Sequence, residues 1–221
     1  MRADGVVDAG SLVVLTAAVS EEHRADVLHS VLLAQLVADR KHDRHMDAAS
    51  WYPVYGETLE KIGWVVEESS GFDVYRSRGN PSPVETVVLD TLGPVSDEKS
   101  RELVTVQWTS LAALADDDPA AVVFEEHGKT RTAGNFQVLL VSDTVGGVVV
   151  RLGRFRFRSD REVPALRKAR LSTRSTVQRG SQVLHLNEQV YAPLRDDITA
   201  KLGSRVDAFV RPVHVQGEAC A

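Results

Sequence analysis

The chain has 221 residues, of which 43% are hydrophobic and 26% are charged, and its formal net charge is −5. This length and balance are typical of soluble globular proteins and exclude disordered and fibrous classes. Cys220 is the only cysteine, so a fold held by intrachain disulfides is also excluded. We expect one α+β domain over residues 1–221.

The first apolar segment runs from Ser11 to Val19 and follows Asp4 and Asp8. A signal peptide would carry positive charge before its apolar part, so we expect a first strand or another buried segment here instead. No apolar run approaches the roughly 20 residues of a membrane-spanning helix. We therefore expect a soluble protein with a cytoplasmic location.

Apolar residues then recur at helical spacing in four segments, and we expect helices over residues 21–41, 48–63, 83–92 and 97–115. Ser20 and Asp47 stand in the N-cap positions of the first two, where side-chain oxygens accept hydrogen bonds from free backbone N–H groups. Residues 82–85 have the pattern of a capping box before the third helix. The helical part therefore covers about residues 20–115.

From about Ala121 the period changes to alternation, which is typical of strands. We expect strands at 121–127, 135–144, 148–158, 166–178 and 182–187, with hairpin turns at 144–147 and 179–181. A helix capped by Asn187 and a last strand at 205–215 complete the sheet part, about residues 120–215. Helices first and strands afterwards predict an α+β fold. In it, N-terminal helices cover one face of an antiparallel sheet formed mainly by the C-terminal half, with one further helix near the C-terminus.

Residues 151–179 carry ten arginine or lysine residues against Asp160 and Glu162, a net charge of +8 in an acidic chain. In a strand, alternation places Phe155 and Phe157 on the core side and the arginines on the opposite side. We therefore predict a basic sheet face. Its binding residues are Arg151, Arg154, Arg156, Arg158, Arg170 and Arg174.

Three interpretations of this basic face compete. It is a solvated strand face, a docking surface for an acidic protein or a second copy of the chain, or a surface that contacts phosphates of nucleic acid or anionic lipid. Nucleic acid is disfavoured, because base stacking needs exposed aromatic rings beside the arginines. We expect a non-catalytic protein without a cofactor that binds an acidic partner or assembles into a homo-oligomer. A secreted effector or toxin that attaches to anionic membranes is an alternative.

A second alternative is a metal-dependent hydrolase. His42 and His45 lie three residues apart, so a continued helix would place both on one face, with Asp39 or Asp43 close enough to complete a metal site. The polar end of a helix explains the same residues without a metal.

Three aromatic residues, Trp51, Tyr52 and Tyr55, follow this histidine segment. We expect any ligand cleft to lie beside them. The sequence contains no P-loop, dinucleotide fingerprint or serine-hydrolase elbow that would indicate a specific enzyme class.

Overall fold

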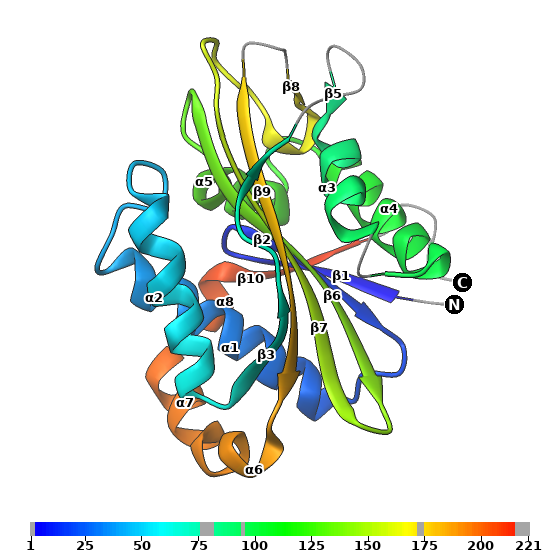
Figure 1. The fold of residues 1–221 in the computed structure, drawn as a ribbon, viewed down its shortest axis with the longest axis vertical. Helices are drawn as coiled ribbons and strands as arrows, with labels where there is room; N and C mark the ends of the chain where they lie inside the picture. Colours follow the sequence, from blue (N-terminus) through cyan, green and yellow to red (C-terminus); the bar gives the residue numbers. More distant parts are fainter. Residues whose placement is uncertain (1–2, 76–81, 94–95, 172–174, 215–221) are drawn as a thin grey trace.

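A mostly antiparallel sheet of eight strands passes between two layers of helices (Figure 1). The computed structural model describes residues 3–75, 82–93, 96–171 and 175–214. Within these residues, the strand order across the sheet is β10 (Val210–Val213), β1 (Ala3–Asp8), β2 (Ser11–Thr16), β6 (Ala133–Thr144), β7 (Gly147–Arg158), β9 (Thr176–Leu186) and β3 (Trp64–Ser69). The short strand β4 (Asp73–Val74) also pairs with β9, and β5 (Ser82–Pro83) pairs with β8 (Arg170–Leu171). The pairing of β2 with β6 is parallel.

Helices cover both faces of the sheet. One layer contains α1 (Glu21–Asp39), α2 (Ala48–Lys61), α6 (Glu188–Tyr191), α7 (Arg195–Leu202) and α8 (Arg205–Phe209). The other contains α3 (Val84–Leu92), α4 (Glu98–Ala113) and α5 (Pro119–Gly128). The predicted α+β class is confirmed, but the expectation of one covered face was wrong. All of β2 and most of β6 are buried, and strands buried on both sides need a helical layer on each.

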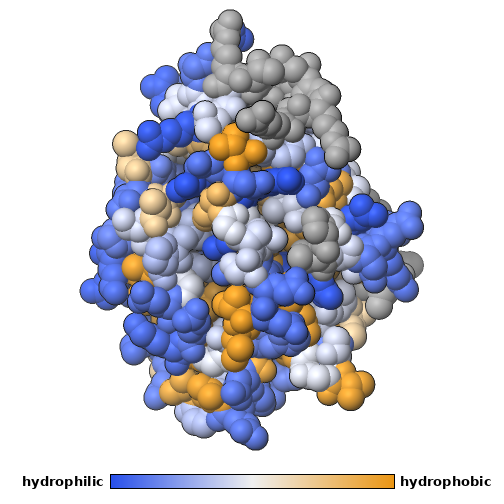
Figure 2. All heavy atoms as spheres, in the orientation of Figure 1, coloured by the Kyte–Doolittle hydropathy of each residue, from blue (hydrophilic) through white to orange (hydrophobic). Residues whose placement is uncertain are grey.

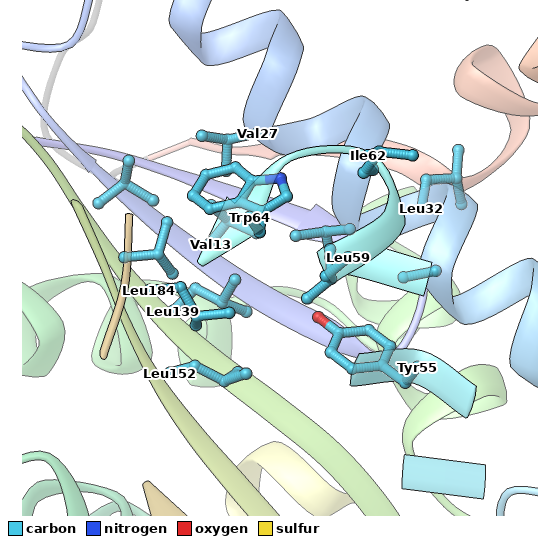
Figure 3. Packing of buried hydrophobic residues seen from close by; sticks show 14 of the residues in the cluster. Val13, Val27, Leu32, Tyr55, Leu59, Ile62, Trp64, Leu139, Leu152 and Leu184 are labelled. Atoms are coloured by element: carbon cyan, nitrogen blue, oxygen red, sulfur yellow. The ribbon is translucent and has the colours of Figure 1, made fainter. Parts of the chain in front are cut away.

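The buried side chains form one cluster on each face. Trp64 of β3 packs with Leu59 of α2 and with Leu139 and Leu184 of the sheet in the α1–α2 cluster (Figure 3). On the other face, Trp108 of α4 and Phe155 of β7 belong to the α3–α5 cluster.

The helix starts predicted from caps are mostly correct. The hydroxyl of Ser20 accepts a hydrogen bond from the backbone N–H of His23, and the carboxylate of Asp47 accepts one from Ser50. The predicted capping box at residues 82–85 requires Ser82 as the N-cap of the third helix, and the structure places the cap one residue later. Pro83 is the N-cap of α3 and gives no side-chain cap.

The predicted strand at residues 121–127 is wrong, because this segment lies inside α5. The carboxylate of Asp118 accepts a hydrogen bond from the N–H of Ala120, and Pro119 occupies the first turn, where its missing N–H costs nothing. Ala120, Val123 and Phe124 then follow one buried helical face.

The predicted turn at residues 179–181 is also wrong, since β9 continues unbroken from Thr176 to Leu186. A Cβ at Gly180 would lie 3.1 Å from the carbonyl oxygen of Gly71 and 3.1 Å from Nη2 of Arg154. This glycine therefore permits a close approach inside the sheet rather than a turn.

The segments flanking β9 also differ from the prediction. The expected strand at 166–178 is a short 3₁₀ turn at Leu166–Lys168, then β8, then the start of β9. The single helix expected after Asn187 is α6, a 3₁₀ turn at Ala192–Leu194, and α7. The last strand, β10, is shorter than predicted, since α8 precedes it.

Candidate functional site

The strand β7 has the alternation that the sequence predicts around Phe155. Phe155 and Phe157 are buried in the α3–α5 cluster. Arg154 and Arg156 are half-buried and Arg158 is exposed, on the face toward α2. Two-residue alternation therefore separates these guanidinium groups from the phenylalanine rings.

Arg151 does not belong to this basic face, which corrects the predicted set. It stands opposite Leu140 of β6, and Leu140 packs into the α3–α5 cluster. Its position is an odd number of residues from Arg154, so its side chain leaves the strand on the opposite side. Arg170 is exposed in β8, outside the main sheet, and Arg174 lies outside the described residues.

Arg154 is held by its neighbours. Its Nη2 donates a hydrogen bond to the carbonyl oxygen of Ser70 at 2.7 Å. Its guanidinium lies 5.0 Å from the ring centroid of Phe72 and 5.8 Å from that of Tyr52. Burial lowers the pKa of Arg154 from its ordinary value, although arginine remains charged in proteins. These contacts hold the Arg154 guanidinium in place within the protein.

Arg156 and Arg158 line an open pocket of about 360 Å³ between the end of the sheet and the start of α2. Arg156 also lies 4.7 Å above the ring of Phe72. Within the described part of the chain, no carboxylate lies within salt-bridge distance of either guanidinium. The complete lining is His45, Met46, Asp47, Ala48, Ala49, Gly134, Arg156, Phe157, Arg158, Thr176 and Gln178.

The start of α2 adds positive potential to this pocket. Ala48 and Ala49, in the first turn of the helix, line it together with the N-cap residue Asp47. Backbone N–H groups at a helix N-terminus carry partial positive charge. Asp47 is the one acidic residue in the lining, and its carboxylate is engaged by Ser50 and by Nδ1 of His42 at 3.1 Å. Hydrogen bonding to Ser50, foremost, lowers its pKa.

A buried arginine fixes the connector between α1 and α2. Arg44 donates hydrogen bonds to Asp39, to the carbonyl oxygen of His127 and to Gln35. The backbone carbonyl of Arg44 accepts a hydrogen bond from Nδ2 of Asn135 in β6 at 2.7 Å. This hydrogen bond therefore fixes the connector, on one side of the pocket, against the sheet on the other side.

This anchor was not predicted from the sequence. Asn135 and Gln137 alternate with apolar residues along β6, and both are buried on the face toward α2. Polar residues at alternate positions in a buried strand indicate a hydrogen-bonded network. That pattern is the signal that could have identified the anchor.

The two predicted metal ligands do not lie on a helix. α1 ends at Asp39, and His42 and His45 lie in the turns that follow it. His42 pairs with Asp47, whereas His45 lines the pocket. Burial, and next the charge of Arg44, lower the pKa of His45 to about 4, so this imidazole is neutral at physiological pH.

Neither histidine belongs to a group of three metal-binding side chains in the described ranges. The one such group there is Glu22, His23 and Glu188, two of which are exposed acids. Nδ1 of His23 already contacts Asp143 at 2.6 Å. The described geometry therefore gives the hydrolase alternative no three-ligand site at His42 and His45.

The three aromatic side chains expected to line a cleft pack against one another instead. Trp51 and Tyr55 stack with ring centroids 5.2 Å apart, and Tyr52 meets Trp51 edge-on at 5.0 Å. All three are buried. The pocket beside Arg156 and Arg158 is lined by the first turn of α2 and by none of these three rings.

Part of the basic stretch is neutralised by other elements. Arg167 is buried and bonds to Asp116 and Glu125, and Lys168 pairs with Asp116. Arg179 lies 3.7 Å from a carboxylate oxygen of Asp73. The ten basic residues thus do not form one continuous exposed patch. The two that line the pocket without a salt bridge among the described residues are Arg156 and Arg158.

The chain matches no protein-family model and no curated protein sequence. A solved structure described as a delta-endotoxin has a TM-score of 0.45 and 9% identity, over 81% of this chain and 81% of that one. A structure of the Evf virulence factor has a TM-score of 0.42 and 10% identity, over 97% of this chain and 93% of that one. Likenesses this distant carry no functional argument.

Proposed function

We propose that this protein is a non-catalytic binding protein whose pocket beside Arg156 and Arg158 docks an acidic segment of a protein partner. One observation carries the proposal. Two guanidinium groups line an open pocket, and no carboxylate of the described residues lies within salt-bridge distance of either; Asp47, the one acid in the lining, pairs with His42. A charged group that lacks an internal partner is available to a ligand of opposite charge.

The shape of the pocket favours a side chain or short segment over a broad surface contact. A volume of about 360 Å³ lies in the range of pockets that enclose small ligands. Carboxylates suit this lining, because arginine recognises them through paired hydrogen bonds and the helix start contributes further donors. A second copy of this chain is one candidate partner, since its net charge is −5.

Binding of a fluorescein-labelled octaglutamate peptide to the full chain, followed by fluorescence anisotropy, tests the proposal. We expect Arg158→Glu to weaken binding about tenfold, because it replaces an exposed attractive charge with a repulsive one. Arg156→Gln should add to this loss. The control is Lys99→Glu with Arg101→Glu, two exposed positions on α4, which makes a larger charge change away from the pocket and should leave the affinity unchanged.

Two further measurements identify the class of partner. Light scattering that shows an oligomer, lost in Arg158→Glu, would identify a second copy as the acidic partner. Flotation with phosphatidylserine vesicles tests the membrane alternative. Vesicle binding that depends on Arg158, together with no peptide binding, would overturn the proposal in favour of a membrane surface.

No helix within the described ranges has both the length and the apolar character needed to cross a bilayer. Hydrophilic side chains cover much of the face shown in Figure 2, and hydrophobic atoms appear there in scattered patches.

A further inference from the structure

A second hollow lies on the helical layer formed by α1, α2, α7 and α8. It is a groove of about 740 Å³ and shares no lining residue with the pocket at Arg156 and Arg158. Its lining is Leu33, Leu36, Val37, Arg40, Lys41, Val54, Glu57, Thr58, Lys61, Lys201, Leu202 and Arg205.

The floor of the groove is apolar because some apolar residues of α1 do not pack against the sheet. Val31, Leu32 and Ala34 are buried on the sheet side of this helix. Leu33, together with Leu36 and Val37 three and four positions later, is half-buried along the groove. Residues at this spacing form one continuous helical stripe. The stripe from Leu33 to Val37, joined by Val54 of α2, thus gives the groove an apolar floor.

The rim is strongly cationic. Five basic side chains line the groove, against the single carboxylate of Glu57: Arg40, Lys41, Lys61, Lys201 and Arg205. Glu57 pairs with Lys61 at 3.7 Å. Among the residues that the structure describes, no carboxylate lies within salt-bridge distance of the other four. Three of these cations, Arg40, Lys41 and Lys61, come from residues 1–150, which carry 12 basic and 24 acidic side chains, so their clustering runs against the acidic balance of that part of the chain.

We infer that this groove docks an amphipathic helix of a partner protein, with an apolar stripe against the floor and carboxylates beside both rims. Grooves between helices bind amphipathic helices through anchors at positions i, i+3, i+4 and i+7. The stretch from Leu33 to Arg40, the C-cap of α1, is about 10 Å long at 1.5 Å per residue, which matches roughly two turns of a bound helix. Arg40 and Lys41 directly after α1, Lys61 of α2, Lys201 of α7 and Arg205 of α8 supply the cations that would meet carboxylates on the flanks of that helix.

The test uses the full chain and two fluorescein-labelled peptides of identical composition. One is a designed amphipathic helix with leucines on one face and glutamates on both flanks, and the other is its scrambled sequence. We expect the amphipathic peptide to bind at least about tenfold more tightly than the scrambled one, with an affinity that falls as salt is raised. Equal binding of the two peptides would overturn the inference.

Charge reversal at the rim locates the binding site. Lys41 and Lys201 are exposed, so Lys41→Glu with Lys201→Glu should leave the fold intact while weakening the amphipathic peptide about tenfold. Circular dichroism confirms the fold, and Lys99→Glu with Arg101→Glu on α4 is here the charge-matched control. An unchanged affinity in the rim variant would refute the assignment.

The same variants separate this inference from the proposed function. Arg158→Glu should affect octaglutamate and spare the amphipathic peptide, whereas the rim variant should do the reverse. An oligomer of the unliganded chain that dissociates in the rim variant would show that the groove is filled by another copy, against the inference. Rim-dependent flotation with anionic vesicles, without peptide binding, would assign the groove to lipid and also overturn it.

Discussion

Arg195 of α7 donates two hydrogen bonds to the carboxylate of Asp26 in α1, one from Nε and one from Nη2, each 2.8 Å long. The two residues are 169 positions apart, and the Asp26 side chain is 1% exposed. Arg195 also contacts Glu188 at 2.6 Å. These hydrogen bonds raise the pKa of Arg195 above its ordinary value. The pair therefore ties the C-terminal helices to the first helix of the chain.

Removal of the arginine should cost more stability than neutralisation of the aspartate. Arg195→Leu leaves a buried carboxylate without its partner, for which we expect a loss of about 3–5 kcal/mol in the free energy of unfolding. Asp26→Asn keeps the side-chain shape and one hydrogen-bond acceptor, and Arg195 remains partly solvated. We therefore expect a loss of about 1–2 kcal/mol in the free energy of unfolding. Urea denaturation of both variants checks the order. Equal losses would show that Asp26 does not depend on Arg195.

Asp8 should destabilise the protein at neutral pH. This residue is fully buried, and neither carboxylate oxygen has a hydrogen-bond partner among the described residues. Burial raises its pKa well above the ordinary value of 3.8, against the opposing effect of the charge on Arg44. Well below pH 3.8 both the folded and unfolded states hold the proton. As pH rises, the unfolded state ionises first, so stability falls until the raised folded pKa is reached.

Asp8→Asn removes this ionisation. We expect the variant to melt at a higher temperature than the wild type at pH 8, with a much smaller difference at pH 4. Each unit of pKa difference corresponds to about 1.4 kcal/mol. Asp117→Asn, at an exposed position, is the matched control and should follow the wild type at both pH values. A difference in melting temperature that does not change with pH would contradict this assignment of the effect to the Asp8 proton.

Loss of the hydroxyl should change stability differently at two buried tyrosines. The hydroxyl of Tyr52 donates to Oδ1 of Asn135 at 2.6 Å and accepts from Nε2 of Gln137 at 3.1 Å. The hydroxyl of Tyr55 is buried with no hydrogen-bond partner among the described residues, and Figure 3 shows it among apolar side chains. We expect Tyr52→Phe to cost about 1–3 kcal/mol and Tyr55→Phe to be neutral or stabilising. Thermal denaturation of both variants measures the two changes in stability. Similar losses of stability would show that the hydroxyl of Tyr55 is also hydrogen-bonded.

The sequence predicts the helices with side-chain caps well and the strands near them less well. Ser20 and Asp47 satisfy backbone groups within one turn of the chain, so local sequence decides where α1 and α2 begin. For α5, the same kind of local signal was present in Asp118 and Pro119, but the apolar run after Ala121 resembles a buried strand equally well. Periodicity alone cannot separate these two for short apolar segments.

The remaining errors depend on tertiary contacts. Gly180 has a turn-like sequence environment, but its role is set by Ser70 and Gly71, more than a hundred residues away. For the site, strand alternation predicts the side of Phe155 and Arg156. It does not predict that the start of α2 closes a pocket there, because that depends on Arg44 bonding to Asn135 and to residues of two other elements.

Two glycine-to-alanine substitutions should change stability in opposite directions. Gly56 lies in α2, and an added Cβ would meet nothing within 4 Å. Alanine has higher helix propensity than glycine and restricts the unfolded chain, so we expect Gly56→Ala to stabilise by about 0.5–1 kcal/mol.

Gly134 in β6 is the contrasting position. An added Cβ there would overlap the ring of Phe157, which is buried in the α3–α5 cluster, so the ring must move. We expect Gly134→Ala to destabilise by about 1–3 kcal/mol through overpacking. Gly134 and Phe157 both line the pocket, so a displaced ring should also weaken octaglutamate binding, whereas Gly56→Ala leaves it unchanged. Denaturation and anisotropy on both variants measure the two effects. A Gly134→Ala variant with wild-type stability would mean that the core around Phe157 is loose enough to absorb a methyl group.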